Sequence, residues 1–170
     1  PLLLNKPLWV FVYGTLKKNF MNSRVLETAR RIGVGQAITA DSHYVMYKER
    51  GKKFPYVQKL AEARSDKIKP GRILGELYQV DIETMLELDA LEGNGYHYRR
   101  VKAPIIWNYN SLPVRKYGSS ECDPKSFKKI EAWVYLKMGD FPDPEKFSGR
   151  SPECSLMPTT GAFKTGDDDV

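Results

Sequence analysis

One carboxylate, Glu92, lies where a general acid or base could work. The residues after Asp81 place Met85 and Leu88 at helical spacing. At 100° per residue, Glu92 projects about 20° from Met85 and about 40° from Leu88, so it shares the stripe that should face the core. Burial there would raise the pKa of a carboxyl group toward the range that suits proton transfer. Alternatively, Gly93 ends the helix and Glu92 turns outward to water, and the spacing alone leaves both readings open.

The tetrapeptide Tyr13, Gly14, Thr15 and Leu16 is the second candidate. Its first residue, Tyr13, is the last residue of the segment 8–13, whose β-branched and aromatic residues are typical of a strand buried on both faces. Glycine after such a strand lets a ligand approach the backbone closely. Successive N–H groups in the turn could bind an anion or an oxyanion. An ordinary turn after a central strand would have the same sequence, so the tetrapeptide alone does not establish a site.

Other chemistries lack their motifs. His43 and His97 have no Cys or Asp at metal-ligand spacing, and neither HExxH nor CxxC occurs. We therefore expect no metal. The sequence has no glycine-rich phosphate loop, which disfavours a nucleotide-dependent enzyme. Cys122 lies in a polar segment without a neighbouring His, so we assign it no role.

The composition limits the classes of protein that fit. A chain of 170 residues, 41% hydrophobic and 28% charged, suits one globular domain with or without a tail. The net charge of +6 is dispersed, and its densest group, residues 48–53, is broken by Glu49 and Gly51, as in a solvated loop. Two cysteines form no disulfide framework, and no apolar run approaches the roughly 20 residues of a membrane helix. We expect a cytoplasmic monomer that binds neither nucleic acid nor membranes.

Periodicity and turn residues predict an α+β fold. Two helices are expected, at 23–32 and from 82 to Gly93, with Asp81 as the N-cap of the second. The expected strands are 8–13, 36–47, 54–60, 72–80, 98–106 and 130–137. This order favours a small mixed sheet, possibly curled into a barrel, with flanking helices.

Two further segments have the composition of irregular structure. Residues 108–127 are polar and contain Ser and Pro, as in a long loop. Residues 139–170 are rich in proline and end in acidic residues, which predicts a mostly irregular tail. We accordingly place one domain at 1–138 and the tail at 139–170.

Together these segments resemble a known family. Residues 10–17, which include the letters YGTL, resemble the opening strand and loop of the AIG2-like gamma-glutamyl cyclotransferases. Residues 75–80, 88–93 and 96–100 are similar to the second signature of that family, and Trp133-Val134-Tyr135 matches its closing strand. The YGTL form and the segment Phe54-Pro55-Tyr56-Val57 look most like the gamma-glutamylamine cyclotransferase branch, in which a similar stretch borders the pocket.

The resemblance implies a fold, a site and a reaction. The fold is a small mixed barrel with flanking helices. Glu92 would be the catalytic acid/base, and Tyr13, Gly14, Thr15 and Leu16 would bind the gamma-glutamyl group, largely through their backbone. The α-amine of the substrate would attack its γ-carbonyl carbon and release 5-oxoproline and an amine, such as lysine from L-γ-glutamyl-L-ε-lysine. Neither a metal nor another cofactor is required.

Two alternatives to a gamma-glutamylamine substrate stay open. The same site could act on gamma-glutamyl dipeptides or glutathione. The chain could also be a non-catalytic binding module that kept the fold, although a carboxylate on an apolar stripe is costly without a use.

Overall fold

The computed structural model describes 7–13, 36–52, 54–60, 62, 68–108 and 127–157. Several sequence-based predictions fall outside these ranges: the helix at 23–32, the loop residues Gly14, Thr15 and Leu16, most of the loop at 108–127 with Cys122, and the end of the tail.

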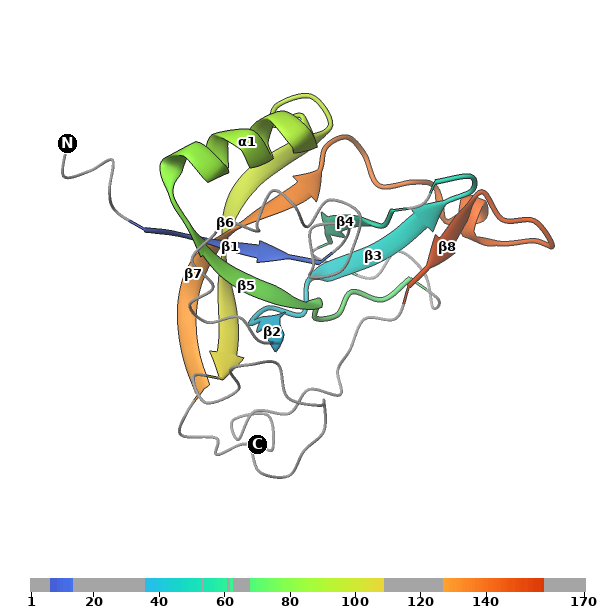
Figure 1. Cartoon of the computed structure of the whole chain (residues 1–170). Coiled ribbons are helices and arrows are strands. Elements are labelled where there is room, and N and C mark those ends of the chain that lie inside the picture. The colour runs from blue at the N-terminus through green and yellow to red at the C-terminus, as the bar shows by residue number, and fades with distance from the viewer. Residues whose placement is uncertain are drawn as a thin grey trace.

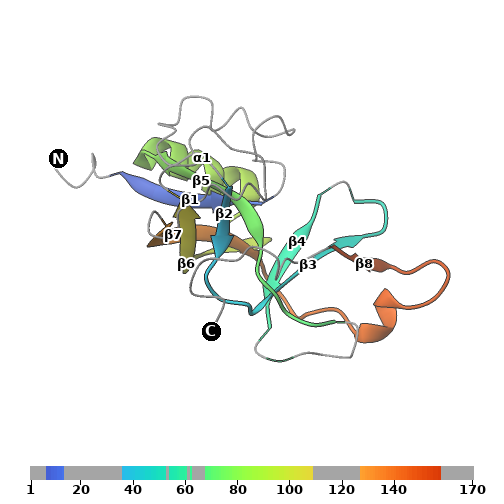
Figure 2. The ribbon, with the colours of Figure 1, turned by 90° about the horizontal axis from the view of Figure 1, so that it is seen from below.

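Five strands close into a barrel in the order β1-β5-β2-β6-β7 (Figures 1 and 2). β1 is antiparallel to β5 but parallel to β7, which it meets at Val10 and Trp133. The barrel is therefore mixed, and the predicted fold class is confirmed; the described residues hold one α-helix beside it. The five strands are β1 (Leu8–Val12), β2 (Gln36–Thr39), β5 (Leu74–Val80), β6 (Tyr98–Asn108) and β7 (Phe127–Lys137).

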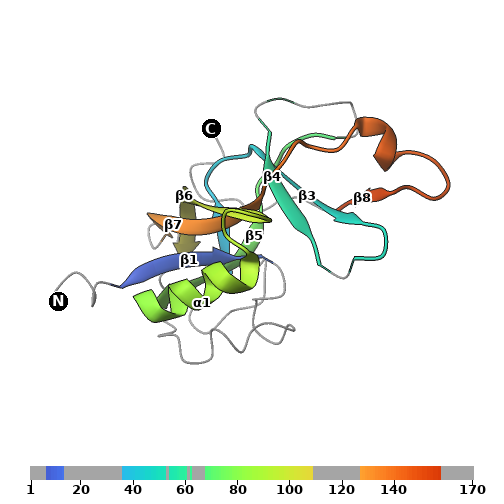
Figure 3. The ribbon, with the colours of Figure 1, turned by 90° about the horizontal axis from the view of Figure 1, so that it is seen from above.

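A second, three-stranded sheet lies beside the barrel, in the order β4-β3-β8 (Figures 1 and 3). Its strands are β3 (Tyr44–Glu49), β4 (Tyr56–Lys59) and β8 (Cys154–Leu156). The prediction of one strand over 36–47 was wrong, because residues 40–43 separate β2 in the barrel from β3 in this sheet. The Thr39 hydroxyl donates to the Asp41 carbonyl at 3.0 Å, and such local hydrogen bonds favour a turn over a continuing strand.

The first part of the expected tail contacts the small sheet. It contains a short 3-10 helix, η3 (Pro144–Phe147), and β8, which pairs with β3. Phe141 and Phe147 stack with ring centroids 5.5 Å apart, and both meet Tyr47 edge-on at 5.4 and 5.6 Å. Aromatic packing of Phe141 and Phe147 and the pairing of β8 therefore hold this segment against β3. The domain boundary placed after residue 138 stays a prediction.

The helix α1 (Ile82–Glu92) begins and ends where the sequence predicts. The Asp81 carboxylate accepts a hydrogen bond from the Thr84 backbone N–H at 2.8 Å, which lowers the pKa of Asp81 and satisfies a free donor of the first turn. Gly93 ends the helix with φ 60° and ψ 52°, a left-handed conformation that glycine adopts at low cost. Within the described ranges, no helix combines the length and apolarity that a membrane span needs.

α1 lies along the outer face of β1 and β5 (Figure 3). Its fully buried residues, Met85 and Leu88, belong to one cluster with Val10, Tyr78 and Tyr135 from β1, β5 and β7. Burying a Leu or Met side chain contributes about 1.5–3 kcal/mol each. This contact fixes the direction of the helix, and hence the place of its last residue, Glu92.

Close packing between β1 and β5 requires a glycine at position 75. A Cβ atom there would lie 2.3 Å from the Val12 carbonyl oxygen and 2.6 Å from the Phe11 ring. Phe11 is buried in the barrel core, so the ring has little room to move.

We predict that Gly75→Ala lowers the free energy of unfolding by about 3 kcal/mol, because the strands would have to separate to admit the methyl group. Urea denaturation measures this loss. The control is Gly51→Ala, whose Cβ would meet no atom within 4 Å but whose φ is +83°, which costs about 1 kcal/mol. Equal losses in the two variants would contradict the close approach of β1 and β5.

Candidate active site

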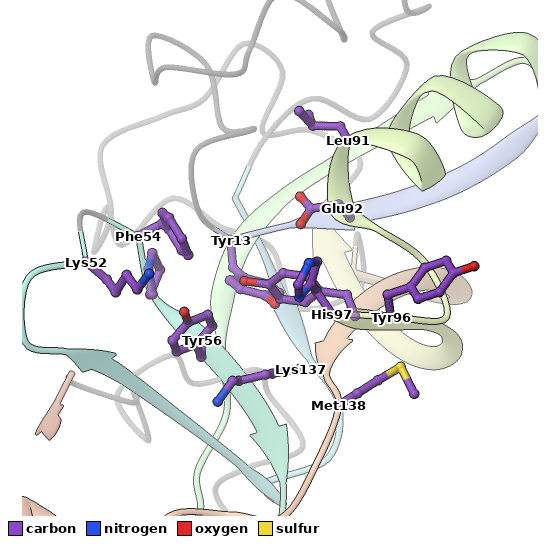
Figure 4. A pocket seen from close by; sticks show the side chains of 12 residues that line it. Tyr13, Lys52, Phe54, Tyr56, Leu91, Glu92, Tyr96, His97, Lys137 and Met138 are labelled. Atoms are coloured by element: carbon purple, nitrogen blue, oxygen red, sulfur yellow. The ribbon is translucent and has the colours of Figure 1, made fainter. Parts of the chain in front are cut away.

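A cavity of about 390 Å3 lies between the end of α1 and the β3–β4 hairpin (Figure 4). One side is formed by the end of α1 and the turn after it, and the opposite side by the hairpin. Described residues that line it are Leu91, Glu92, Tyr96, His97 and Tyr98 on the first side, Lys52, Phe54, Pro55 and Tyr56 on the second, and Tyr13, Lys137 and Met138 between them.

Glu92 carries its carboxylate into this cavity, on the side of Tyr13 and His97 (Figure 4). Because Met85 and Leu88 hold the same stripe of α1 against the barrel, the carboxylate cannot turn fully to water. Among the described residues it has no ion-pair partner, and burial raises its pKa from 4.5 to about 7. Of the two readings of Glu92 left open by the sequence, the structure has the inward-facing one.

The turn after α1 places His97 beside Glu92 on the same side of the cavity. The His97 N–H donates to the Gly93 carbonyl at 3.0 Å, and the Asn94 N–H donates to the Asp89 carbonyl at 2.9 Å. A Cβ at position 93 would lie 2.9 Å from the His97 ring. Gly93 is therefore needed both for its left-handed backbone and for the space that His97 occupies.

Tyr13 directly follows β1 and is held in place by a hydrogen bond to β7. Its hydroxyl donates a hydrogen bond to the Tyr135 carbonyl, and burial with the nearby Tyr98 and Glu92 raises its pKa well above the usual value. The phenol therefore stays protonated at neutral pH. Its partners in the predicted loop, Gly14, Thr15 and Leu16, lie outside the described residues, so their part in the site stays a prediction.

A polar network one turn before Glu92 fixes the end of α1. The Tyr135 hydroxyl donates to Asp89 Oδ1 at 2.7 Å, and Arg100 Nε lies 2.9 Å from the same oxygen. The Arg100 guanidinium stacks on the Trp133 ring at 4.3 Å, which limits its movement. Asp89 lies three residues before Glu92 on the helix, and Arg100 compensates its charge.

The hairpin side of the cavity is aromatic and basic. Phe54 and Tyr56 meet edge-on at 5.6 Å, and Tyr56 lies 6.3 Å from the Tyr98 ring across the cavity. Lys137 Nζ lies 4.5 Å from the Tyr56 ring and 3.2 Å from Glu49 Oε1. The resemblance of 54–57 to a pocket-bordering stretch is thus matched by Phe54, Pro55 and Tyr56, while Val57 is buried in the core.

Sequence reasoning did not identify Lys52, Lys137, Asp89 or Arg100. Asp89 and Arg100 lie inside the segments that carry the family resemblance, and the position of Asp89 three residues before Glu92 was the available signal. The two lysines give no such signal, because only the pairing of β3 with β4 and the closure of the barrel bring them to the cavity.

The described residues contain no group of three His, Cys, Asp or Glu side chains that could hold a metal. His97 lines the cavity, whereas His43 does not line it. The cavity-facing carboxylate of Glu92, with a pKa of about 7, is suited to proton transfer.

Comparison with known proteins gives a consistent assignment. A family model described as "Gamma-glutamyl cyclotransferase, AIG2-like" matches residues 10–152. MJ1514 of Methanocaldococcus jannaschii, provisionally named a gamma-glutamylcyclotransferase, is 33% identical over 157 residues, which cover 92% of this chain and 95% of that protein.

Solved structures share the fold at lower identity. An AIG2-like protein from Mus musculus is 20% identical with a TM-score of 0.55, over 83% of this chain and 82% of that one. The Arabidopsis thaliana protein At5g39720.1 is 20% identical with a TM-score of 0.53, over 84% and 76% of the two chains.

The raised pKa of Glu92 predicts a pH-dependent cost in stability. Because the folded-state pKa of about 7 exceeds the usual 4.5, the folded protein binds this proton more tightly, so the free energy of unfolding falls as pH rises from 4.5 through 7. Relative to Glu92→Gln, the wild type should lose about 2 kcal/mol between pH 5 and pH 8.

Urea denaturation of both proteins at the two pH values measures this difference. Glu87→Gln, on the exposed side of the same helix, is the control and should follow the wild type. A constant offset between wild type and Glu92→Gln from pH 5 to 8 would contradict the burial of the ionised carboxylate.

Proposed function

Because the chain belongs to the AIG2-like gamma-glutamyl cyclotransferase family, we propose that it releases 5-oxoproline from a gamma-glutamyl compound with Glu92 as the acid/base. The observation that carries this proposal is the Glu92 carboxylate, which faces a cavity, has a pKa raised by burial, and is held by the helix that packs on the barrel.

Cyclisation of the γ-glutamyl group depends mainly on proton transfer. The α-amine of the substrate attacks its own γ-carbonyl carbon, a five-membered lactam forms, and the bond to the leaving nitrogen breaks without consumption of water. The attacking nitrogen must lose protons and the leaving nitrogen must gain them. A carboxyl group with a pKa of about 7 exists in both forms at neutral pH, so it can accept from the first nitrogen and donate to the second.

The cavity would also select the reactive conformer. Since nucleophile and electrophile belong to one molecule, holding the γ-glutamyl chain in its cyclised shape lowers the barrier by reducing the entropy lost on the way to the transition state. The Tyr13 hydroxyl is engaged with the Tyr135 carbonyl, so Tyr13 contributes a fixed wall. In this proposal Gly14, Thr15 and Leu16 bind the γ-glutamyl group through backbone N–H groups, which can stabilise an oxyanion.

For the substrate we propose a gamma-glutamylamine, such as L-γ-glutamyl-L-ε-lysine. The YGTL form of the loop and the segment at 54–57 support this branch, and a cavity of about 390 Å3 has room for a leaving group as long as lysine. Gamma-glutamyl dipeptides and glutathione are the second candidate, and they would use the same Glu92.

We expect Glu92→Gln to lower kcat by at least about 100-fold on every substrate that the wild type turns over, because the amide cannot exchange protons. Release of 5-oxoproline from γ-glutamyl-ε-lysine, γ-glutamyl-alanine and glutathione is the measurement, and Glu87→Gln is the matched control.

Full turnover by folded Glu92→Gln would overturn the acid/base role. An inactive wild type on all three substrates would instead favour a non-catalytic binding module. Preference for γ-glutamyl-ε-lysine over the two others would place the chain in the gamma-glutamylamine branch.

The pH profile should report the same carboxylate. Because Glu92 must be ionised to accept the first proton, kcat/KM should fall tenfold per pH unit below an apparent pKa of about 7. Initial rates from pH 4 to 9 on the best substrate test this, and an acid limb near pH 4.5 would contradict a buried catalytic carboxylate.

A further inference from the structure

Two lysines among the described residues that line the cavity, Lys137 and Lys52, differ in how their charge is compensated. Lys137 Nζ lies 3.2 Å from Glu49 Oε1 and 4.5 Å from the Tyr56 ring, and it also donates to the Tyr47 hydroxyl at 3.4 Å. No ion pair or hydrogen bond joins the Lys52 ammonium to another described residue, although Lys52 lines the same cavity.

Lys52 and Glu92 come from opposite sides of the cavity (Figure 4). Glu92 ends α1, whereas Lys52 belongs to the turn between β3 and β4, where its N–H donates to the Glu49 carbonyl at 3.1 Å. Phe54 and Tyr56 follow on the same hairpin and are held edge-on to each other. The cavity therefore has a carboxylate on one wall. On the other wall, a cation that no described residue compensates lies beside an aromatic surface.

A gamma-glutamyl substrate fits this polarity in one direction. Its reacting atoms must lie within hydrogen-bond reach of Glu92, and in the binding mode that we infer the leaving group extends toward the hairpin. The aromatic rings can cover the apolar chain of the leaving amine, and an anion at its far end would meet the cation of Lys52.

We propose that Lys52 determines the leaving group: it binds a carboxylate carried by the departing amine, so that amino acids leave in preference to simple alkylamines. This inference rests on the proposed cyclotransferase activity and adds the chemical class of the leaving group. Lys52 acts here as a specificity residue, without a part in proton transfer.

The test pairs one substrate with its decarboxylated twin. γ-Glutamyl-ε-lysine and γ-glutamyl-cadaverine differ only in the carboxylate of the leaving group, and γ-glutamyl-alanine and γ-glutamyl-ethylamide form a second, shorter pair. The comparison uses whichever pair the wild type turns over faster. Within that pair, kcat/KM should be about fivefold higher for the carboxylate-bearing member, which is the range of an exposed ion pair.

Lys52→Met should remove this preference by raising KM for the carboxylate-bearing member alone, while Lys52→Arg should retain it. Added salt should weaken the preference of the wild type. Lys129→Met is the matched control, because it removes one exposed positive charge from β7 at a residue that is not among those lining the cavity, and it should leave all rates unchanged.

Three results would overturn the inference. An equal loss on both members of a pair in Lys52→Met would mean that Lys52 binds the carboxylate of the γ-glutamyl group itself. No loss on either member would leave Lys52 without a role in binding. If the wild type is inactive on all four compounds, both the proposed function and the inference are overturned. If the wild type is active and Lys52→Met has no effect on its rates, the inference alone is overturned.

Discussion

The packing of one face of α1 on the barrel is the interaction on which the site depends. Met85 and Leu88 are fully buried against β1, β5 and β7. Because the helix has 3.6 residues per turn, the same rotation that buries Leu88 carries Glu92 inward at the last turn. The apolar contact, worth several kcal/mol, thus offsets the cost of desolvating a carboxylate.

The polar residues around the helix end restrict this placement further. Tyr135 and Arg100 both contact Asp89, and Arg100 is stacked on Trp133. The strands that supply these residues, β6 and β7, also form the longest antiparallel pair in the barrel. A movement of the end of α1 would therefore leave Asp89 without its partners, and an unpaired, largely buried charge is strongly unfavourable.

The barrel and the small sheet supply opposite sides of the cavity. The barrel and α1 supply Glu92 and Tyr13, whereas the small sheet supplies the hairpin wall with Lys52, Phe54 and Tyr56. Residues 141–156 contact the small sheet through Tyr47 and through β8. A segment that the sequence presents as a tail therefore supports the wall from which we infer the selection of the leaving group.

Local features could be predicted from the sequence: the buried strand before Tyr13, the start of α1 after Asp81, its end at Gly93, and the angular position of Glu92 on the apolar stripe. Each depends on spacing or capping within a few residues, which the order of residues expresses directly. The direction in which Glu92 faces could be settled by the three-dimensional fold alone, since it depends on the surface against which α1 packs. The fold also decided the split of 36–47 into β2 and β3, because β2 pairs with β5 and β6 in the barrel whereas β3 pairs with β4 and β8 in the small sheet. The place of Lys52 and Lys137 at one cavity likewise depends on how the β3–β4 hairpin lies beside the barrel.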